Sequence, residues 1–413
     1  MSYLPPLPRL FKGLCAVGFL ARASYALART PVLALFAAAL GAGPEAIGFC
    51  VAASTVTGIF FKMPAGVLAD VLGRRRTLLL GLACFAFIPL AYLHVSSYPG
   101  LVAVRFAHGL ATAIYGPVSM AMVAGLAQER RAEMLSWFSS LTIVGNLLGA
   151  PLGGFLLTHL SPGAGPGLGT FHQVYGAVAA LGMASWLLAL WVLRGQGEEL
   201  RPEGGRIRSA VAAQFLAGVR EILLDRRVFL TSNLEGVLYL ALGALEAFLP
   251  IYAVQICGFS AFQAGLLWGV QIVTVILSKP IMGGFSDRHG RTGLLFWGMF
   301  VCALSFAGVP WVRHFPLLLG LAACFGLGEA VVTSSAAALV ADFCRQDHLG
   351  SAMGAFGTIF DVGHALGPLL AGVLIAFWGG VDYRAPFAVI AVLLVTAALA
   401  FRAGVPAPGR GQP

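Results

Sequence analysis

Charged residues are scarce in this chain: Asp, Glu, Lys and Arg make up only 10% of its 413 residues. An ordinary soluble domain carries roughly 25% charged residues, which help to cover its surface with groups that water solvates. Here 59% of the residues are hydrophobic instead. A soluble protein could not cover its surface with so few charges, so the composition predicts a polytopic membrane protein.

Motifs of several catalytic and metal-binding classes are also missing. The seven cysteines include no CxxC pair and no metal-ligand spacing, so they predict neither a disulfide framework nor a metal site. There is no GxxxxGK[ST] loop, so ATP is not expected to drive the process directly. No soluble segment is long enough for a catalytic site. We therefore expect no enzyme, no catalytic residues and no cofactor other than a coupling proton.

What the chain does contain is a series of long apolar runs. Twelve of them approach or exceed the roughly 20 residues that a membrane-spanning helix needs. They are predicted at residues 11–39, 46–69, 77–96, 100–126, 134–158, 171–193, 228–256, 262–285, 292–312, 316–341, 350–377 and 384–402. A polar linker at 194–227 divides them, which predicts an all-α membrane protein with six-helix bundles at 1–193 and 228–413.

One short motif occurs twice. The segment Gly66-Val-Leu-Ala-Asp-Val-Leu-Gly-Arg-Arg-Arg76 is echoed by a segment 217 positions later, which runs from Gly283 to Thr292. The matching pairs are Asp70 with Asp287, Gly73 with Gly290, Arg74 with Arg291 and Lys62 with Lys279. Four polar coincidences at one offset, inside apolar sequence, indicate an internal duplication with two pseudo-symmetric halves.

The basic residues lie mostly on one side of the predicted membrane. With the N-terminus inside, nineteen of the 26 Lys and Arg residues are cytoplasmic and only two, Arg313 and Arg384, are external. Short loops rich in Lys and Arg stay in the cytoplasm. The distribution predicts cytoplasmic N- and C-termini in a cell (inner) membrane. It also explains the net charge of +9 without a nucleic-acid partner.

Two six-helix halves in the same orientation resemble the major facilitator superfamily. The segment Gly66-x-x-x-Asp70-x-x-Gly73-Arg74 matches that family's loop between helices 2 and 3, and Leu101-x-x-x-Arg105-x-x-x-Gly109 resembles its helix 4 motif. Gly145-x-x-x-Gly149-Ala-Pro151-x-Gly153-Gly154 resembles the helix 5 motif of its antiporters, although the proline is one place later than usual. The resemblance implies a secondary transporter, and we expect a monomer in the lipid bilayer that binds a small-molecule substrate.

The duplicated loops are expected to act as a conformational latch. In the resembling family the Asp at position 70 is thought to cap helix 11, where the helix macrodipole favours an anion. The expected latch residues are Gly66, Asp70, Gly73, Arg74, Asp287, Gly290 and Arg291. From the residues alone, the arginines can equally be anchors that follow the positive-inside rule.

The runs at 134–158 and 350–377 carry small residues along one face. The expected helix-packing residues are Gly145, Gly149, Pro151, Gly153, Gly154, Gly363, Gly367 and Pro368. In lipid, small residues allow close contact between helix backbones. Close packing alone accounts for most of these glycines, and the resemblance adds the expectation that the two helices face the opposite half and slide against it.

Several charges fall inside predicted spans, where each costs at least about 2.5 kcal/mol unless it is paired or hydrated. A buried carboxylate can take and release a proton as its exposure alternates. The proton-coupling candidates are Glu246, Glu329, Asp361, His364 and, through the resemblance, Arg105. Alternatively, acids and arginines neutralise each other as structural ion pairs.

The first span carries arginines where multidrug exporters of the resembling family often carry an acid. Arg22 and Arg29 favour a substrate with a carboxylate, phosphate or other acceptor-rich group. The remaining substrate-binding candidates are Tyr25, Tyr115, Asn146, Tyr239 and Gln271.

The sequence therefore predicts a secondary active transporter of a small organic molecule that works by alternating access. The Gly145–Gly154 motif favours proton-coupled export, whereas the arginines of the first span favour uptake of an organic anion or other metabolite. A third hypothesis is a membrane scaffold or sensor that transports nothing. Duplicated loops and several buried charges count against it.

Overall fold

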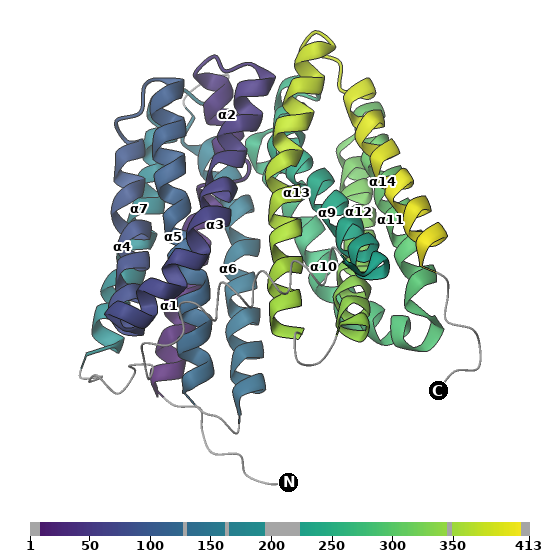
Figure 1. Ribbon diagram of the computed structural model, residues 1–413. Coiled ribbons are helices and arrows are strands. Elements are labelled where there is room, and N and C mark those ends of the chain that lie inside the picture. The colour runs from purple at the N-terminus through teal and green to yellow at the C-terminus, as the bar shows by residue number, and fades with distance from the viewer. Residues whose placement is uncertain (1–8, 127–129, 162–164, 195–223, 345–348, 406–413) are drawn as a thin grey trace. The chain divides into compact units, whose positions relative to one another are not determined.

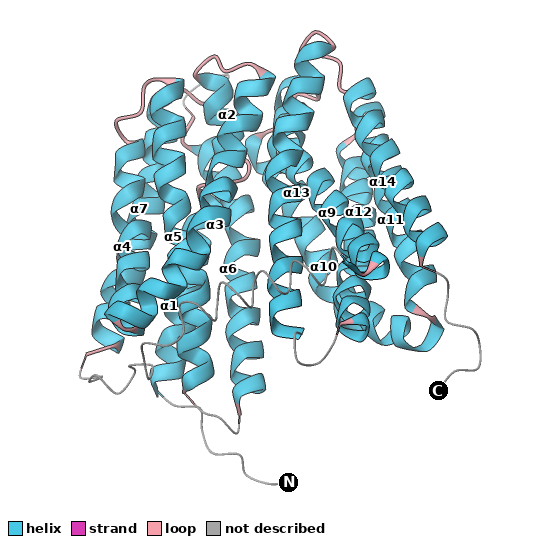
Figure 2. Ribbon diagram, viewed as in Figure 1, coloured by secondary structure: helices cyan, strands magenta, loops and turns pink. Residues whose placement is uncertain are grey.

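The computed structural model describes residues 9–126, 130–161, 165–194, 224–344 and 349–405 (Figure 1). Every regular element in these ranges is helical (Figure 2). In a bilayer the backbone must satisfy its hydrogen bonds within the segment, and long apolar helices do so. Most of the predicted linker lies outside the described residues.

The first half of the chain, coloured purple to blue in Figure 1, forms six spans from seven helices. They are α1 (Arg9–Leu27), α2 (Val32–Ala39), α3 (Pro44–Leu72), α4 (Arg74–Tyr92), α5 (Tyr98–Gly125), α6 (Arg131–His159) and α7 (Leu168–Val192). Helices α1 and α2 together make the first span.

The second half, coloured green to yellow, repeats this arrangement. Its elements are α9 (Arg226–Ile251), the π-helix η2 (Tyr252–Ile256), α10 (Ala261–His289), α11 (Arg291–Gly308), the 3-10 helix η3 (Val309–Trp311), α12 (Phe315–Phe343), α13 (Leu349–Phe377) and α14 (Arg384–Gly404). Twelve spans in the described residues are long and apolar enough to cross a membrane, which confirms the predicted number.

The helix ends confirm the internal duplication. Helices α3 and α10 both begin and end 217 residues apart, and the first span, Arg9–Ala39, maps onto Arg226–Ile256 at the same offset. Helices α6 and α13 are 218 residues apart at both ends. The repeat is therefore a property of the whole fold and not only of the two glycine loops.

The first predicted run, 11–39, is not one continuous helix. It breaks at Ala28–Pro31, between α1 and α2. A proline disfavours helical backbone in the residue before it, and Pro31 has no amide hydrogen to donate, so a helix usually ends at this point. The corresponding run in the second half ends in η2, just after Pro250.

The described residues divide into two compact units, one within 9–41 and 56–194 and the other within 42–55 and 224–405. In the first unit α1 packs on α6 and α7, and α4 packs on α5 and α7. In the second, α9 packs on α13 and α14, and α11 packs on α12 and α14. These pairs correspond under the repeat, so both units use the same helix contacts.

Candidate functional site

The duplicated loops turn at equivalent glycines. Gly73 joins α3 to α4 with φ of 87°, and Gly290 joins α10 to α11 with φ of 92°. Residues other than glycine rarely adopt this backbone region, which explains why the motif keeps glycine at both positions. Gly66 has no such requirement, because a Cβ there would meet no atom within 4 Å.

The arginine that follows each glycine turn is bonded within its own unit. Nη1 of Arg74 donates a 3.3 Å hydrogen bond to the carbonyl oxygen of Ala121, near the C-terminal end of α5. Arg291 forms an ion pair with Asp342, near the C-terminal end of α12. Cations are favoured at helix C-termini, where the macrodipole is negative. Both arginines therefore fix the start of one helix to the end of the next.

Asp70 and Asp287 occupy the last turns of α3 and α10, but their side chains lie outside what the structure describes. The latch assigned to these two residues stays a prediction.

The glycine faces of α6 and α13 pack inside their own units, on α1 and α9. A Cβ on Gly145 would lie 2.6 Å from the carbonyl oxygen of Phe19, and one on Gly149 would collide with Ala26. On α13, a Cβ on Gly363 would run into the carbonyl oxygen of Gly236. These glycines are occupied by the nearest helix of the same unit, as close packing alone predicts. The expectation that the two helices slide against the opposite half stays a prediction.

Arg105, on α5, is the largest charged side chain enclosed in the first unit, with 0% of its surface exposed. Its guanidinium carbon lies 5.1 Å from the ring centroid of Tyr25, which packs edge-on against His108. His108 is also 0% exposed and has the Tyr92 hydroxyl 3.5 Å from its Nδ1. Because a guanidinium stays charged in proteins, Arg105 supplies a fixed positive charge and does not itself carry a coupling proton.

The two candidate arginines of the first span are half-buried on or beside α1. The guanidinium carbon of Arg22 lies 6.0 Å from the ring centroid of Tyr115, whereas Arg29 stands in the break between α1 and α2. Asn146 is half-buried on α6. These candidates thus belong to neighbouring helices.

In the second unit the charged side chains of the candidate site are carboxylates. Glu246 on α9, 3% exposed, lies beside His364 on α13, with 3.1 Å between Oε2 and Nε2. The sequence placed His364 one turn from Asp361, and the structure adds Glu246 as a partner on the adjacent helix. The ring of Tyr239 stacks on Phe360 and packs edge-on against His364.

A second carboxylate, Glu329 on α12, is hydrogen-bonded to Gln271 on α10. The side-chain nitrogen of Gln271 donates to Oε2 of Glu329, and the two side chains are 5% and 8% exposed. Gln271 was predicted to bind substrate and Glu329 to carry a proton. The structure joins these two candidates in one buried pair.

Glu235 on α9 is a candidate that the sequence did not single out. Its side chain is 4% exposed, and Oε2 is buried without a hydrogen bond among the described residues. Lys279 and Glu329 lie within electrostatic reach of it, and so does Tyr239. The sequence feature that could have identified Glu235 is its isolated charge within an apolar run, on the same helical face as Ser232 and Tyr239.

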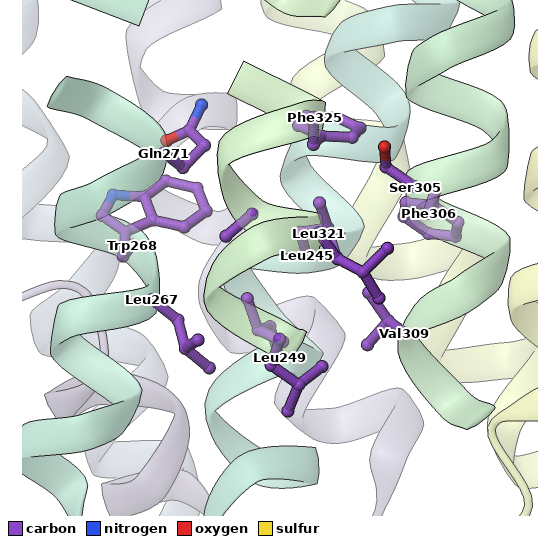
Figure 3. Close-up of a pocket in the computed structure, with 12 residues that line it drawn as sticks. Leu245, Leu249, Leu267, Trp268, Gln271, Ser305, Phe306, Val309, Leu321 and Phe325 are labelled. Atoms are coloured by element: carbon purple, nitrogen blue, oxygen red, sulfur yellow. The ribbon is translucent and has the colours of Figure 1, made fainter. Parts of the chain in front are cut away.

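A pocket lies next to the Glu329–Gln271 pair, between α9, α10, α12 and the α11–η3 region (Figure 3). The space between these side chains is about 380 Å³ when the part open to the outside is counted, so the enclosed cavity is much smaller. The lining is apolar apart from Gln271 and Ser305, and consists of Leu245, Leu249, Leu267, Trp268, Gln271, Ser305, Phe306, Val309, Leu318, Leu321, Ala322 and Phe325. Ligand pockets commonly combine such an apolar wall with a few polar groups.

Comparison with known protein families assigns the fold. The family model described as Major Facilitator Superfamily matches residues 14–312 and 236–413. The chain belongs to the Major Facilitator Superfamily. It is 22% identical over 369 residues to an uncharacterized MFS-type transporter of Methanocaldococcus jannaschii, a match that covers 88% of each chain.

Two further relatives of this superfamily member carry names that refer to drugs. The multidrug transporter MdfA of Yersinia pestis is 26% identical over 58% of this chain and 56% of its own length. A multidrug resistance efflux pump PmrA homologue of Lactococcus lactis is 29% identical over 37% of each chain. The chain thus spans only part of the length of these two relatives.

Solved structures of the superfamily share the fold of this chain. The nucleoside transporter NupG has a TM-score of 0.80 at 15% identity, with 96% of this chain and 99% of that chain covered. A bacterial homologue of the human lysosomal transporter Spinster has a TM-score of 0.79 at 13% identity, with 96% of each chain covered. At these identities the likeness concerns the fold alone. This chain is a multi-pass membrane protein of a transporter superfamily.

Proposed function

We propose that the protein is a secondary active transporter that exports a small organic molecule in exchange for protons. The observation that carries the proposal is the set of buried carboxylates in the second unit. Glu329 is bonded to Gln271, and Glu246 lies beside His364. Carboxylates held in this way can exchange protons as their exposure changes, and titratable groups in such surroundings mark functional sites.

The direction of transport is supported by the relatives. MdfA and the PmrA homologue are named as a multidrug transporter and an efflux pump. The antiporter-like glycine motif on α6 agrees with export. We further propose that both termini are cytoplasmic, that the protein lies in the inner cell membrane and that it works as a monomer.

Everted membrane vesicles that carry the protein provide the test, with ethidium as the probe of drug export. We expect ethidium uptake that starts when a proton gradient is formed, collapses with a protonophore and is lost in Glu329→Gln. The matched control is Thr274→Val, because the one partner of the Thr274 hydroxyl among the described residues is the Val270 carbonyl of its own helix. Ethidium movement that ignores the proton gradient would contradict proton-coupled export.

Uptake of an organic anion or another metabolite is the second candidate. It is favoured by the arginines of the first unit, Arg22, Arg29 and Arg105. NupG, which shares the fold, is named as a nucleoside transporter. Accumulation of labelled uridine or organic anions in intact cells, without ethidium export, would favour this candidate. Absence of flux for every probe in liposomes would favour a scaffold or sensor.

A further inference from the structure

Gln271 contacts both the pocket and Glu329. Its side-chain nitrogen donates to Glu329, while the same residue forms part of the pocket wall beside Trp268 (Figure 3). Its Oε1 atom is buried and accepts no hydrogen bond from the residues that the structure describes. The hydroxyl of Thr333, one turn from Glu329, makes no hydrogen bond either and does not satisfy it.

A buried amide oxygen without a donor is unfavourable, by roughly tenfold or more in an equilibrium constant. An ionised carboxylate only accepts hydrogen bonds, whereas a protonated carboxyl group has one O–H to donate. A proton on Glu329 can therefore complete a two-bond pair, in which Gln271 donates through nitrogen and accepts through oxygen. When Glu329 loses that proton to water, the amide oxygen is again without a donor.

We propose that the amide oxygen of Gln271 accepts a hydrogen bond either from protonated Glu329 or from a ligand in the adjacent pocket, but not from both. The wall is apolar apart from Gln271 and Ser305, which defines the ligand class: a small, mostly apolar molecule, such as an aromatic ring, with one hydrogen-bond donor for the Gln271 oxygen. Proton and ligand then exclude each other at one atom. This inference rests on the proposed proton-coupled export and gives it a residue-level cause.

Other charged and titratable groups face Glu329 and set the background of this competition. They are Lys279 on the same helix as Gln271, Cys302 on α11, and Glu235 and Tyr239 on α9. None of these four lines the pocket. They can change the pH at which Glu329 exchanges its proton, but they do not replace the contact between the ligand and Gln271.

Indole and 1-methylindole test the proposal, because they share an aromatic body and only indole has an N–H donor. The measurement is the thermal unfolding temperature of the purified protein in lipid nanodiscs, since a ligand of the folded state raises it. We expect indole to raise this temperature at neutral pH and to do so much less in mildly acidic buffer. We expect 1-methylindole to have little effect at either pH.

Two variants locate the effect. Gln271→Met keeps the volume but removes the acceptor, so the difference between the two indoles should vanish. In Glu329→Gln the new amide can donate to Gln271 permanently, so the response to indole should be weak at both pH values. The control Thr274→Val should respond as the wild type does. If Gln271→Met does not fold, the response of Glu329→Gln to indole still tests the proposal.

Equal responses to indole and 1-methylindole would overturn the proposal, as would an unchanged indole response in either variant. An indole response that is the same at both pH values would overturn the competition with the proton. The ethidium assay is independent of this test. Vesicles without proton-driven ethidium flux, combined with the expected indole results, would contradict proton-coupled export but leave the Gln271 site standing.

Discussion

In the first compact unit the buried and half-buried charged side chains of the candidate site are arginines, whereas in the second they are carboxylates. Arg22, Arg29 and Arg105 belong to α1, its break and α5. Glu246 and Glu329 belong to α9 and α12, which occupy the equivalent places in the repeat. Two copies of one helical arrangement thus carry opposite charges in their interiors.

This difference separates two kinds of chemistry. A guanidinium keeps its charge, so it can attract anions, donate hydrogen bonds or stack on aromatic rings, as Arg105 does on Tyr25. A carboxylate can be charged or neutral, and Glu329 and Glu246 each lie beside a polar partner. We infer that any proton exchange belongs to the second unit and that the first unit contributes fixed positive charge.

What the units share is their glycine packing, and disrupting it should have the largest effect on stability. Gly363→Ala places a methyl group against the carbonyl oxygen of Gly236, and Gly149→Ala places one against Ala26. Overpacking of this kind costs about 1–3 kcal/mol. Both variants should show a lower thermal unfolding temperature and a smaller folded yield by size-exclusion chromatography.

The matched control is Gly354→Ala on α13, where a Cβ would meet no atom within 4 Å. It should be neutral or slightly stabilising, because Ala favours a helix by about 1 kcal/mol over Gly. If Gly363→Ala were as stable as Gly354→Ala, the close α9–α13 contact would be wrong.

The next largest effect on stability is expected from the coupling between Glu246 and His364 in the second unit. A double-mutant cycle with Glu246→Gln and His364→Gln should give an interaction free energy of about 1–2 kcal/mol, since the pair is buried and in contact. The readout is thermal or denaturant unfolding of the protein in detergent micelles. Additive effects of the two substitutions would mean that they do not interact.

A smaller effect on stability is expected in the first unit, where Arg105 stacks on Tyr25. Tyr25→Leu removes the ring under Arg105 and should lower stability by about 0.5–2 kcal/mol, whereas Tyr25→Phe keeps a ring and should lose less. His108 packs on the same ring, so the comparison of the two variants decides and the pH dependence does not. Equal losses for Tyr25→Leu and Tyr25→Phe would contradict the stacking of Arg105 on this ring.

The smallest effect concerns Asp225, which lies outside the membrane spans and caps α9 by accepting a hydrogen bond from the Arg227 amide. Partial burial raises the pKa of this carboxyl, but hydrogen bonds and charge from Arg227 lower it by more, so the net shift is downward. A lowered native pKa means that the stabilisation is present above the unfolded value and is lost as the pH falls.

Asp225→Asn keeps the cap but removes the charge, at a cost of about 0.3–1 kcal/mol at neutral pH. The difference in unfolding temperature from wild type should shrink below about pH 4, near the ordinary pKa of Asp. A difference that grows on acidification would reverse the assigned sign.

Much of the fold could be predicted from the sequence because it depends on local properties. Apolar length determines the spans, and the matched pairs Gly73/Gly290 and Arg74/Arg291 reveal the duplication. The break before Pro31 was missed because the apolar run continues through it, although the proline itself was a signal.

The pairing of side chains was harder to predict. Glu246, Glu329 and Gln271 were identified individually, since a polar group in an apolar run stands out. Which helix each one meets depends on helix rotation and on contacts such as α9 with α13, which the sequence pattern alone does not specify. For the same reason the sequence did not specify that the glycines of α6 and α13 pack on α1 and α9.

The most direct test of the central claim is infrared difference spectroscopy of the protein in nanodiscs, recorded between mildly acidic and mildly alkaline buffer. Protonated carboxyl groups have a C=O band that ionised ones lack, so the method reads proton exchange without a substrate. We expect a buried-carboxyl band that is lost in Glu329→Gln and unchanged in Arg105→Lys. A spectrum that Glu329→Gln leaves untouched would contradict proton exchange at this residue of the second unit.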